Sequence, residues 1–401
     1  MVLKSLWLRY ENLVGIGESK LIKKRVLLLS EGFGAGHTQA AYALSSSLRK
    51  LSPDVNTKVM ELGSFLNPRM APLIITAYKK TVTSQPRLIG MMYRFQYKKS
   101  LNRITTLALH RIFYTYTKNV INQLRPDVIV CTHPIPSAVI SRLKRLGVNI
   151  PLCTVITDYD AHGNWISPEV DCFLVPTPEV KYKLMRRGVS SSKIQVTGIP
   201  VHPNFWEHPS KDIIREKFHL NEMPTVLVMA GGWGIISDEV INNYLAQWSD
   251  RIQIIFCLGS NKKTLHRMES NPQFKHSNIH LFGFIREIDQ LMEISDVLVT
   301  KPGGMTCSEG LAKGIPMLFH LPIPGQEEEN SQYFTSQGLG EPLTSIDVME
   351  KWIHKLIYEY QEISNRRIEN LETIAKYHPM QSAQSIIDML ESSRTGCTVL
   401  F

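Results

Sequence analysis

The chain of 401 residues is 43% hydrophobic and 20% charged, and it carries a net charge of +9. This composition excludes a disordered or low-complexity chain, and the length favours two domains of ordinary size. No window approaches the roughly 20 apolar residues of a transmembrane helix, and residues 1–20 lack the cleavage site of a secretory signal. Six scattered cysteines without a C-x-x-C pair indicate reduced thiols, so we expect a cytoplasmic protein.

Short apolar runs alternate with helical patterns along the chain, which is typical of parallel-sheet units. We expect strands in two series, first at 25–30, 56–61, 127–132, 152–157 and 172–176, then at 225–230, 252–258, 278–282, 296–300 and 316–319. Helices are expected after the strands, for example at 36–50, 179–187, 238–247, 288–294 and 305–313.

A proline-rich stretch at 200–212 separates the two series and is the expected linker, and the tail from 347 reads as helices with a break near Pro379. We therefore predict an α/β protein with two doubly wound, Rossmann-like domains that face each other across a cleft. In such domains, ligands bind at the carboxyl ends of the strands. The predicted divisions are residues 1–205, residues 206–376, and a helical tail at 377–401 that packs back on the first domain.

The first predicted strand ends in a glycine-rich loop, EGFGAGH, at residues 31–37. Gly32 and Gly34 match the first two glycines of a dinucleotide-binding fingerprint, but His37 stands where the third glycine belongs. A histidine at the start of a helix can titrate near neutral pH and act as a general base. A tight turn without a ligand remains the alternative for this loop.

The span 58–125 holds twelve Lys or Arg residues and one acidic residue, Glu61, so it contributes +11 to the net charge. Its central part interleaves basic with aliphatic and aromatic residues, which favours helices lying on an anionic membrane. Single-stranded nucleic acid attracts similar residues, but no RNA- or DNA-binding motif accompanies the charge, so we expect no nucleic acid partner. A solvated helix face over a core remains the alternative. The basic residues assigned to membrane contact are Lys79, Lys80, Arg94, Lys98 and Lys99.

Two polar loops follow strands of the first domain, at 131–137 (CTHPIPS) and 155–165 (VITDYDAHGNW). Asp158 and His162 can orient a base or contact a substrate hydroxyl, and Trp165 can stack on a sugar or lie in lipid. The spacing of His133, Asp158, Asp160 and His162 matches no common zinc pattern, so we expect no metal site.

The second domain contains a strand, a Pro-Gly-Gly turn, a helix and another strand at 295–319. The backbone N–H groups of Gly303, Gly304, Met305 and Thr306 are expected at the helix N-terminus, which suits a diphosphate. The hydroxyl of Thr306 is the expected N-terminal cap. Glu309, about one turn into the helix, can accept hydrogen bonds from ribose hydroxyls. A plain turn with a solvated glutamate remains the alternative.

Two further loops of the second domain reach the same cleft, at 228–234 (VMAGGWG) and 321–334 (LPIPGQEEENSQYF). The first is a glycine turn that brings Gly232 toward a phosphate or sugar, and the second offers polar side chains that can bind sugar hydroxyls. For Glu328 and Glu329 we favour a solvated position. The chain has no G-x-S-x-G elbow and no G-x-x-x-x-G-K-[ST] loop, which argues against an α/β-hydrolase and a P-loop NTPase.

The ordered motifs GFGAGH, THP, TDYDAHGNW, GIPVHPNF, TKPGGMTCSEGLAKGIP and PIPGQEEEN resemble the diacylglycerol glycosyltransferases. These include plant monogalactosyldiacylglycerol synthases and bacterial processive diacylglycerol glucosyltransferases. The resemblance covers about residues 24 to 390 and implies the GT-B fold, with the nucleotide sugar on the second domain and the lipid acceptor on the first. It also implies inversion at the anomeric carbon without a catalytic metal. Trp233, Glu31 and Phe33 depart from the family pattern.

The resemblance also implies roles for single residues. His37 matches the general base, and we expect Asp158 to assist it. The acceptor side then includes Gly36, His133, His162 and Trp165. The donor side includes Gly232, Phe284, Ile285, Gly303, Gly304, Met305, Thr306, Glu309, Gln326, Glu327 and Asn330.

From these residues we expect an inverting glycosyltransferase that moves a hexose from a UDP-sugar, with UDP-glucose favoured, to the hydroxyl of diacylglycerol. It would need no cofactor beyond its UDP-sugar and would attach peripherally to the cytoplasmic face of the cell membrane. A soluble enzyme resembling UDP-N-acetylglucosamine 2-epimerase is one alternative. A non-catalytic nucleotide-sugar sensor is the other.

Overall fold

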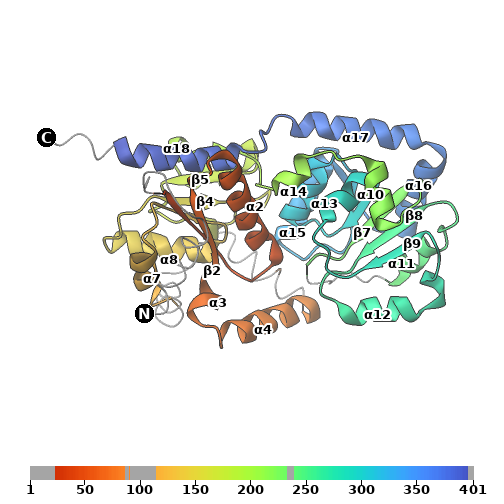
Figure 1. Cartoon of the computed structure of the whole chain (residues 1–401), viewed down its shortest axis with the longest axis horizontal. Helices are drawn as coiled ribbons and strands as arrows, with labels where there is room; N and C mark the ends of the chain where they lie inside the picture. Colours follow the sequence, from red (N-terminus) through yellow and green to blue (C-terminus); the bar gives the residue numbers. More distant parts are fainter. Residues whose placement is uncertain (1–22, 86–89, 91–113, 233–238, 396–401) are drawn as a thin grey trace, which may run out of the picture.

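The computed structural model describes residues 23–85, 90, 114–232 and 239–395, which form two α/β domains side by side (Figure 1). Each domain is built around one six-stranded sheet, and every strand pairing in the described part of the chain is parallel. The prediction of two doubly wound α/β domains is confirmed. Three of the basic residues assigned to membrane contact, Arg94, Lys98 and Lys99, lie outside the described residues, as does Trp233.

The first sheet has the strand order β2-β1-β3-β4-β5-β6. Its strands are β1 (Arg25–Ser30), β2 (Asn56–Glu61), β3 (Val128–Cys131), β4 (Leu152–Val155), β5 (Cys172–Val175) and β6 (Ile194–Val196). Its helices are α2 (Ala35–Leu51), α3 (Leu62–Leu66), α4 (Ala71–Ser84), α7 (Thr117–Leu124), α8 (Pro134–Arg145) and α9 (Pro178–Arg186). The five predicted strands are present, and the short β6 is additional.

The second sheet has the strand order β12-β11-β10-β7-β8-β9. Its strands are β7 (Thr225–Met229), β8 (Gln253–Cys257), β9 (Ile279–Phe282), β10 (Val297–Thr300), β11 (Met317–Phe319) and β12 (Gly340–Pro342). Its helices are α10 (Lys211–Phe218), α11 (Glu239–Ala246), α12 (Lys262–Ser270), α13 (Ile288–Ile294), α14 (Gly304–Ala312), α15 (Gln326–Ser336), α16 (Ile346–Tyr358) and α17 (Tyr360–Ile374). Here β12 is the additional strand.

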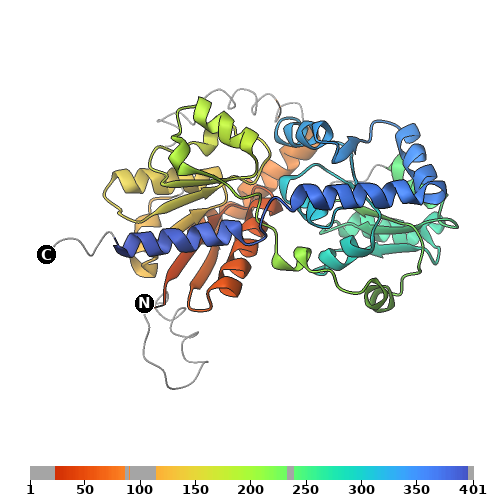
Figure 2. The ribbon, with the colours of Figure 1, turned by 90° about the horizontal axis from the view of Figure 1, so that it is seen from above.

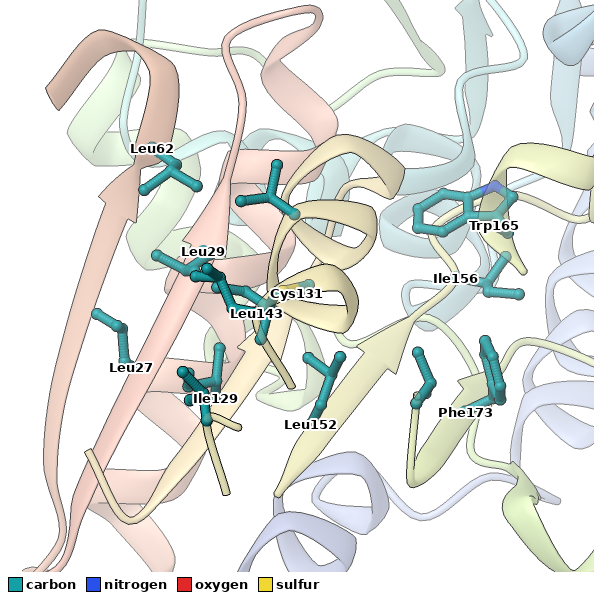
Figure 3. Close-up of a cluster of buried hydrophobic side chains, with 14 of the residues drawn as sticks. Leu27, Leu29, Leu62, Ile129, Cys131, Leu143, Leu152, Ile156, Trp165 and Phe173 are labelled. Atoms are coloured by element: carbon teal, nitrogen blue, oxygen red, sulfur yellow. The ribbon is translucent and has the colours of Figure 1, made fainter. Parts of the chain in front are cut away.

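Both faces of each sheet are covered, which explains why the strands are nearly continuous apolar runs. In β1, Val26 and Leu28 join the core formed with α2, while Leu27 and Leu29 point to the opposite face, toward α7 and α8. Figure 3 shows this second cluster, in which Trp165 closes one end. Burying each such leucine stabilises the fold by roughly 1.5–3 kcal/mol.

The chain crosses between the domains twice. It first passes through residues 197–206, which include a 3-10 turn at Pro203–Trp206, and it returns after α17 to form α18 (Gln381–Thr395). This last helix packs against α2 of the first domain (Figures 1 and 2). The Ser382 hydroxyl donates to Thr197 Oγ1 at 3.0 Å, so the two crossings are tied together.

Helix α4 runs beneath the junction of the two domains in Figure 1. One side of it faces the protein: Ile75 lies against Gly32, the Tyr78 ring meets Phe33 at 5.3 Å, and Val82 is buried. Its other side exposes Leu73 and Lys80. Within the described residues, no helix is long and apolar enough to cross a membrane.

Candidate active site

Two adjoining cavities lie between the domains, at the carboxyl ends of both sheets. The glutamate cavity, of about 340 Å³, is lined by Glu309 and Phe284, and the histidine cavity, of about 270 Å³, is lined by His37 and Asp158. They share the lining residues Ala35, Gly36, Gly231, Gly232, Met305 and Thr306. A ligand can therefore extend from one cavity into the other, between loops that the two domains contribute.

His37 lies in the first turn of α2 and faces the histidine cavity. Its Nδ1 atom is 3.0 Å from the Thr132 carbonyl oxygen and 2.7 Å from Thr157 Oγ1. Because a carbonyl oxygen only accepts hydrogen bonds, Nδ1 carries the ring proton in the neutral imidazole. Nε2 is then the unprotonated nitrogen that can accept a proton from a substrate.

The electrostatic environment keeps His37 neutral. Burial lowers the pKa of His37 to about 4, although the hydrogen bond to the Thr132 carbonyl opposes this shift. Burial also lowers the pKa of His162 to about 4 and that of His133 well below its usual value. A neutral imidazole is the form that a general base requires at pH 7.

The other residues expected on the acceptor side surround the His37 ring. The His133 ring meets it edge to face at 4.7 Å and the Trp165 ring lies at 6.0 Å, while His162 lies 6.0 Å beyond Trp165. Trp165 has no exposed surface, so it supports His37 from within the core and offers no face to a sugar or lipid in this conformation. His133 is also buried, and its Nδ1 accepts the Ile135 N–H at the start of α8.

Asp158 is one of two carboxyl groups of the described residues that line the histidine cavity, and it connects the two domains. Its Oδ1 accepts a hydrogen bond from Gln326 Nε2 of the second domain. Burial raises the pKa of Asp158 to about 7, the Gln326 bond lowers it, and nearby Asp160 raises it further. Asp158 therefore titrates in the physiological range.

The start of α14 lines the histidine cavity from the second domain. Gly303 is the N-cap and the first turn has no side-chain cap, so the predicted capping role of Thr306 is wrong. The helix begins two residues before Thr306, and its backbone N–H groups at residues 304–306 are left without side-chain acceptors, which suits an anion. The backbone here approaches the first domain closely, because a Cβ atom on Gly304 would lie 2.1 Å from the Thr157 carbonyl oxygen.

The glutamate cavity combines carboxyl groups with a loop of the second domain. Burial raises the pKa of Glu309 to about 8, and the charge of Asp289 adds to this effect. Phe284, which is 70% exposed, and Ile285 line the same cavity, and both were predicted to bind the donor. Asp289 and His202 also line it, and neither was predicted as a site residue. His202 stands in the motif GIPVHPNF, whereas Asp289 belongs to no quoted motif and only the fold brings it to this site.

The polar residues of α15 have two different roles: some line the cavity, and one joins the two domains. Gln326 and Glu327 line the histidine cavity, and Glu327 Oε2 accepts the Ile323 N–H at 2.6 Å. Asn330 is fully buried and instead joins the domains, accepting the Tyr159 N–H at 2.8 Å and donating to the Pro302 carbonyl at 3.0 Å. In this conformation Asn330 therefore shapes the site without lining it.

Two further residues of the histidine cavity were missed, Lys301 and Tyr78. Lys301 directly follows β10, and Tyr78 comes from α4, where only basic residues were assigned a contact. Lys79 is half-buried and Lys80 is exposed on the same helix. Thus α4 contributes both to the cavity and to the outer surface.

Across the described part of the chain, no group of three or more His, Cys, Asp or Glu residues is arranged to hold a metal ion. The Asp160 carboxylate, which the sequence places near possible ligands, instead pairs with Lys183 at 2.5 Å. The five described cysteines are buried and form no disulfide with one another.

Comparison with known proteins assigns both halves of the chain. Residues 37–201 match the model of monogalactosyldiacylglycerol (MGDG) synthase, and residues 225–387 match the glycosyltransferase family 28 C-terminal domain. A processive diacylglycerol β-glucosyltransferase of Staphylococcus haemolyticus is 31% identical over 379 residues, covering 91% of this chain and 93% of the relative. This chain belongs to the diacylglycerol glucosyltransferase family. The family predicted from the sequence motifs is confirmed, and so is the prediction of a glycosyltransferase.

Two further relatives agree. The Staphylococcus carnosus enzyme of the same name is 30% identical over 381 residues, covering 92% of this chain and 94% of the relative. The Bacillus licheniformis enzyme is 27% identical over 378 residues, covering 92% and 95%. The similarity thus extends over nearly the whole length of these proteins.

Solved structures establish the GT-B fold. Acinetobacter baumannii MurG has a TM-score of 0.57 at 13% identity and covers 92% of this chain and 99% of its own. Anabaena Alr3699/HepE in complex with UDP-glucose gives the same values. UDP-GlcNAc 2-epimerase from Neisseria meningitidis has a TM-score of 0.56 at 14% identity, covering 92% and 100%. At such low identities these likenesses show the fold alone.

Proposed function

We propose that this glycosyltransferase moves glucose from UDP-glucose to the hydroxyl of diacylglycerol, with inversion at the anomeric carbon, at the cytoplasmic face of the cell membrane. The names of the family relatives support the sugar and the acceptor. The complex of Alr3699/HepE with UDP-glucose supports the nucleotide sugar as ligand of this fold. In this reaction, side chains accept the proton and backbone dipoles stabilise the leaving diphosphate.

One observation carries the proposal: His37 of the first domain and the N-terminus of α14 of the second domain line a single cavity. In an inverting transfer, the base and the leaving group lie on opposite sides of the anomeric carbon. The cavity provides both, because a neutral imidazole accepts the proton and unpaired backbone N–H groups bind the diphosphate. The adjoining glutamate cavity is then assigned to the uridine, with Glu309 on the ribose.

The reaction is a single displacement. The acceptor oxygen forms a bond to the anomeric carbon while the bond from that carbon to the diphosphate breaks. The acceptor proton passes to His37 Nε2, and the electron pair of the broken bond stays on the departing phosphate. Asp158, which faces the same cavity, orients the acceptor or favours the imidazolium that forms.

Helix α4 is assigned to the membrane surface. Its outer side carries exposed Leu73 and Lys80, and its inner side places Tyr78 in the histidine cavity. A lipid acceptor held at the bilayer surface would thereby reach the cavity along this helix. Aliphatic and basic side chains together suit an anionic interface.

Turnover of radiolabelled UDP-glucose and UDP-galactose with diacylglycerol vesicles tests the proposal. We expect a labelled glycolipid from UDP-glucose, at a rate well above that from UDP-galactose. Release of free sugar or conversion of the nucleotide sugar without a lipid product would contradict it. Co-sedimentation with anionic and neutral vesicles tests the membrane assignment separately, and we expect binding to anionic vesicles only.

A further inference from the structure

Lys301 is a basic side chain of the histidine cavity that the proposed reaction has not yet used. It directly follows β10, one of the two central strands of the second sheet, and precedes the Pro-Gly-Gly turn into α14. Its side chain is half-buried and shares the cavity with His37 and Asp158. The position is therefore fixed by the sheet at one end and by the start of α14 at the other.

The ammonium group of Lys301 has no ion pair or hydrogen bond with any described residue. Burial lowers its pKa, and the charge of Glu327 opposes this shift from a distance. The Glu327 carboxylate is itself engaged by the Ile323 N–H. A partly buried cation without a close partner costs free energy, so an anion that enters the cavity gains by meeting it.

The other residues around Lys301 make its attraction for an anion more important. Among the described residues that line the histidine cavity, Lys301 is the only lysine or arginine, whereas Asp158 and Glu327 are both acidic. The N-terminus of α14 contributes about half a positive charge. That half charge alone offsets little of the charge of a diphosphate, and each of the two carboxyl groups repels a diphosphate when it is ionised.

We propose that Lys301 is the cation that meets the β-phosphate of the nucleotide sugar and offsets the charge of the departing diphosphate. The inference rests on the proposed function and deepens it. As the bond between the anomeric carbon and the β-phosphate oxygen breaks, its electron pair remains on that oxygen, beside the Lys301 ammonium. The acceptor oxygen forms the new bond and its proton passes to His37, so Lys301 keeps its own protons throughout. Positive charge fixed where negative charge develops lowers the barrier.

A different role for Lys301 would be to hold Glu327 in place for the sugar. The two roles differ in what they require of the ligand. If Lys301 meets the β-phosphate, removing its charge weakens the binding of UDP even though UDP carries no sugar. The binding of UMP is unchanged, because UMP lacks the β-phosphate. A support for Glu327 affects neither UDP nor UMP, and Glu327→Gln would then reproduce the effects of changing Lys301.

Calorimetric titration with UDP and UMP tests the proposal. In Lys301→Met we expect the affinity for UDP to fall at least tenfold, while the affinity for UMP stays within twofold of the unmodified protein. Lys301→Arg should recover most of the UDP affinity because it restores the charge. Lys263→Met removes an exposed lysine of α12 and should leave both affinities unchanged. Equal losses for UDP and UMP, or no loss for UDP, would overturn the proposal.

Turnover provides the second readout. In Lys301→Met we expect kcat with UDP-glucose to fall about 100-fold. The proposal would be overturned if Lys301→Met bound UDP normally and lost only as much kcat as Glu327→Gln does. If Lys301→Met fails to fold in a thermal melt, Lys301→Gln serves as the uncharged variant. The proposed function is judged separately, by whether the unmodified protein makes a glycolipid. A glycolipid product with unaltered UDP binding in both variants would reject the role of Lys301 alone.

Discussion

The two walls of the cleft are built in different ways. On the first domain, functional groups are side chains held in place by their neighbours: His37 is fixed by the Thr132 carbonyl and Thr157, and rings surround it. On the second domain, the wall at α14 is largely backbone, with Gly303 and Gly304 at the start of the helix. The first wall is suited to moving a proton and the second to holding an anion. The difference explains how one cavity can serve both ends of a displacement.

The walls are also linked to each other. Gln326 donates to Asp158, Asn330 accepts from Tyr159, and the Tyr159 hydroxyl lies 2.8 Å from Ser308 Oγ. These bonds join loop 157–160 of the first domain to α14 and α15 of the second. The spacing between the base and the anion site therefore depends on contacts between the domains, and changes on either wall test distinct parts of the arrangement.

Removing the base should have the largest effect. For His37→Ala we expect kcat to fall by about 10³-fold, in the range usual for loss of a general base, while UDP binds as before. Turnover of labelled UDP-glucose and calorimetry with UDP measure the two quantities. His266→Ala changes a histidine on the surface of α12 and should retain full activity. A His37→Ala enzyme with near-normal turnover would remove the base from the first wall.

Separating the walls should have the next largest effect. A methyl group at Gly304 would meet the Thr157 carbonyl oxygen at 2.1 Å, so Gly304→Ala must push the two domains apart. We expect kcat to fall about 100-fold, because a displacement of about 1 Å can cost that much. Gly303→Ala adds the same group where nothing lies within 4 Å, and its loss should be much smaller. Equal losses in the two variants, measured by turnover, would contradict this geometric explanation.

Much of the arrangement is predictable because it follows from local rules. Apolar runs of four to six residues that end in glycine or polar loops predict buried parallel strands, and the carboxyl ends of such strands meet at one edge. His37, Asp158 and the turn at Gly303 follow strands in this way, and the structure brings them to the same cavity. The short strands β6 and β12 have only three residues each, too few for a recognisable pattern.

What could not be predicted depends on contacts between distant parts of the chain. Trp165 and Asn330 look like ligand-binding residues in the sequence, but packing buries both completely. Tyr78 and Asp289 lie on helices, where their spacing fits an ordinary surface, and only the approach of α4 and α13 to the cleft brings them to the cavities. Lys301 was visible in the motif, but its lack of a partner among the described residues is a property of the folded protein.

A change in the glutamate cavity should have a smaller effect, and this effect should be limited to the binding of the nucleotide by the second domain. Glu309 is assigned to the ribose, so Glu309→Gln should weaken UDP binding by up to about tenfold, as expected for loss of one hydrogen bond. The unmodified protein should prefer UDP to 2′-deoxy-UDP, and the variant should have lost most of this preference. Calorimetry with both nucleotides measures it. An unchanged preference would place the ribose away from Glu309.

The smallest effect on activity is expected for a change next to Glu31, which precedes the glycine loop of the first domain. Its buried carboxyl accepts the Tyr114 hydroxyl at 3.0 Å and the Gly63 N–H at 2.9 Å. Burial raises the pKa of Glu31 to about 7, and both hydrogen bonds lower it. Since the folded protein holds this proton more tightly than the unfolded chain, Glu31 costs stability progressively as the pH rises from about 4.5 to about 7.

Tyr114→Phe removes one of the two bonds and should lower the free energy of unfolding by about 1 kcal/mol. The loss should be greater at pH 8.5, where the carboxylate needs the hydroxyl most, than at pH 5, where Glu31 is protonated. Urea unfolding at both pH values measures this difference, and kcat at pH 7 should stay within about twofold because Tyr114 does not line either cavity. Equal losses at the two pH values, each of the size expected for a hydrogen bond to a charged group, would mean that Glu31 is ionised in the folded protein throughout. A buried charge would then lie behind the His37 side of the cavity, whereas the side formed by the start of α14 is largely uncharged backbone.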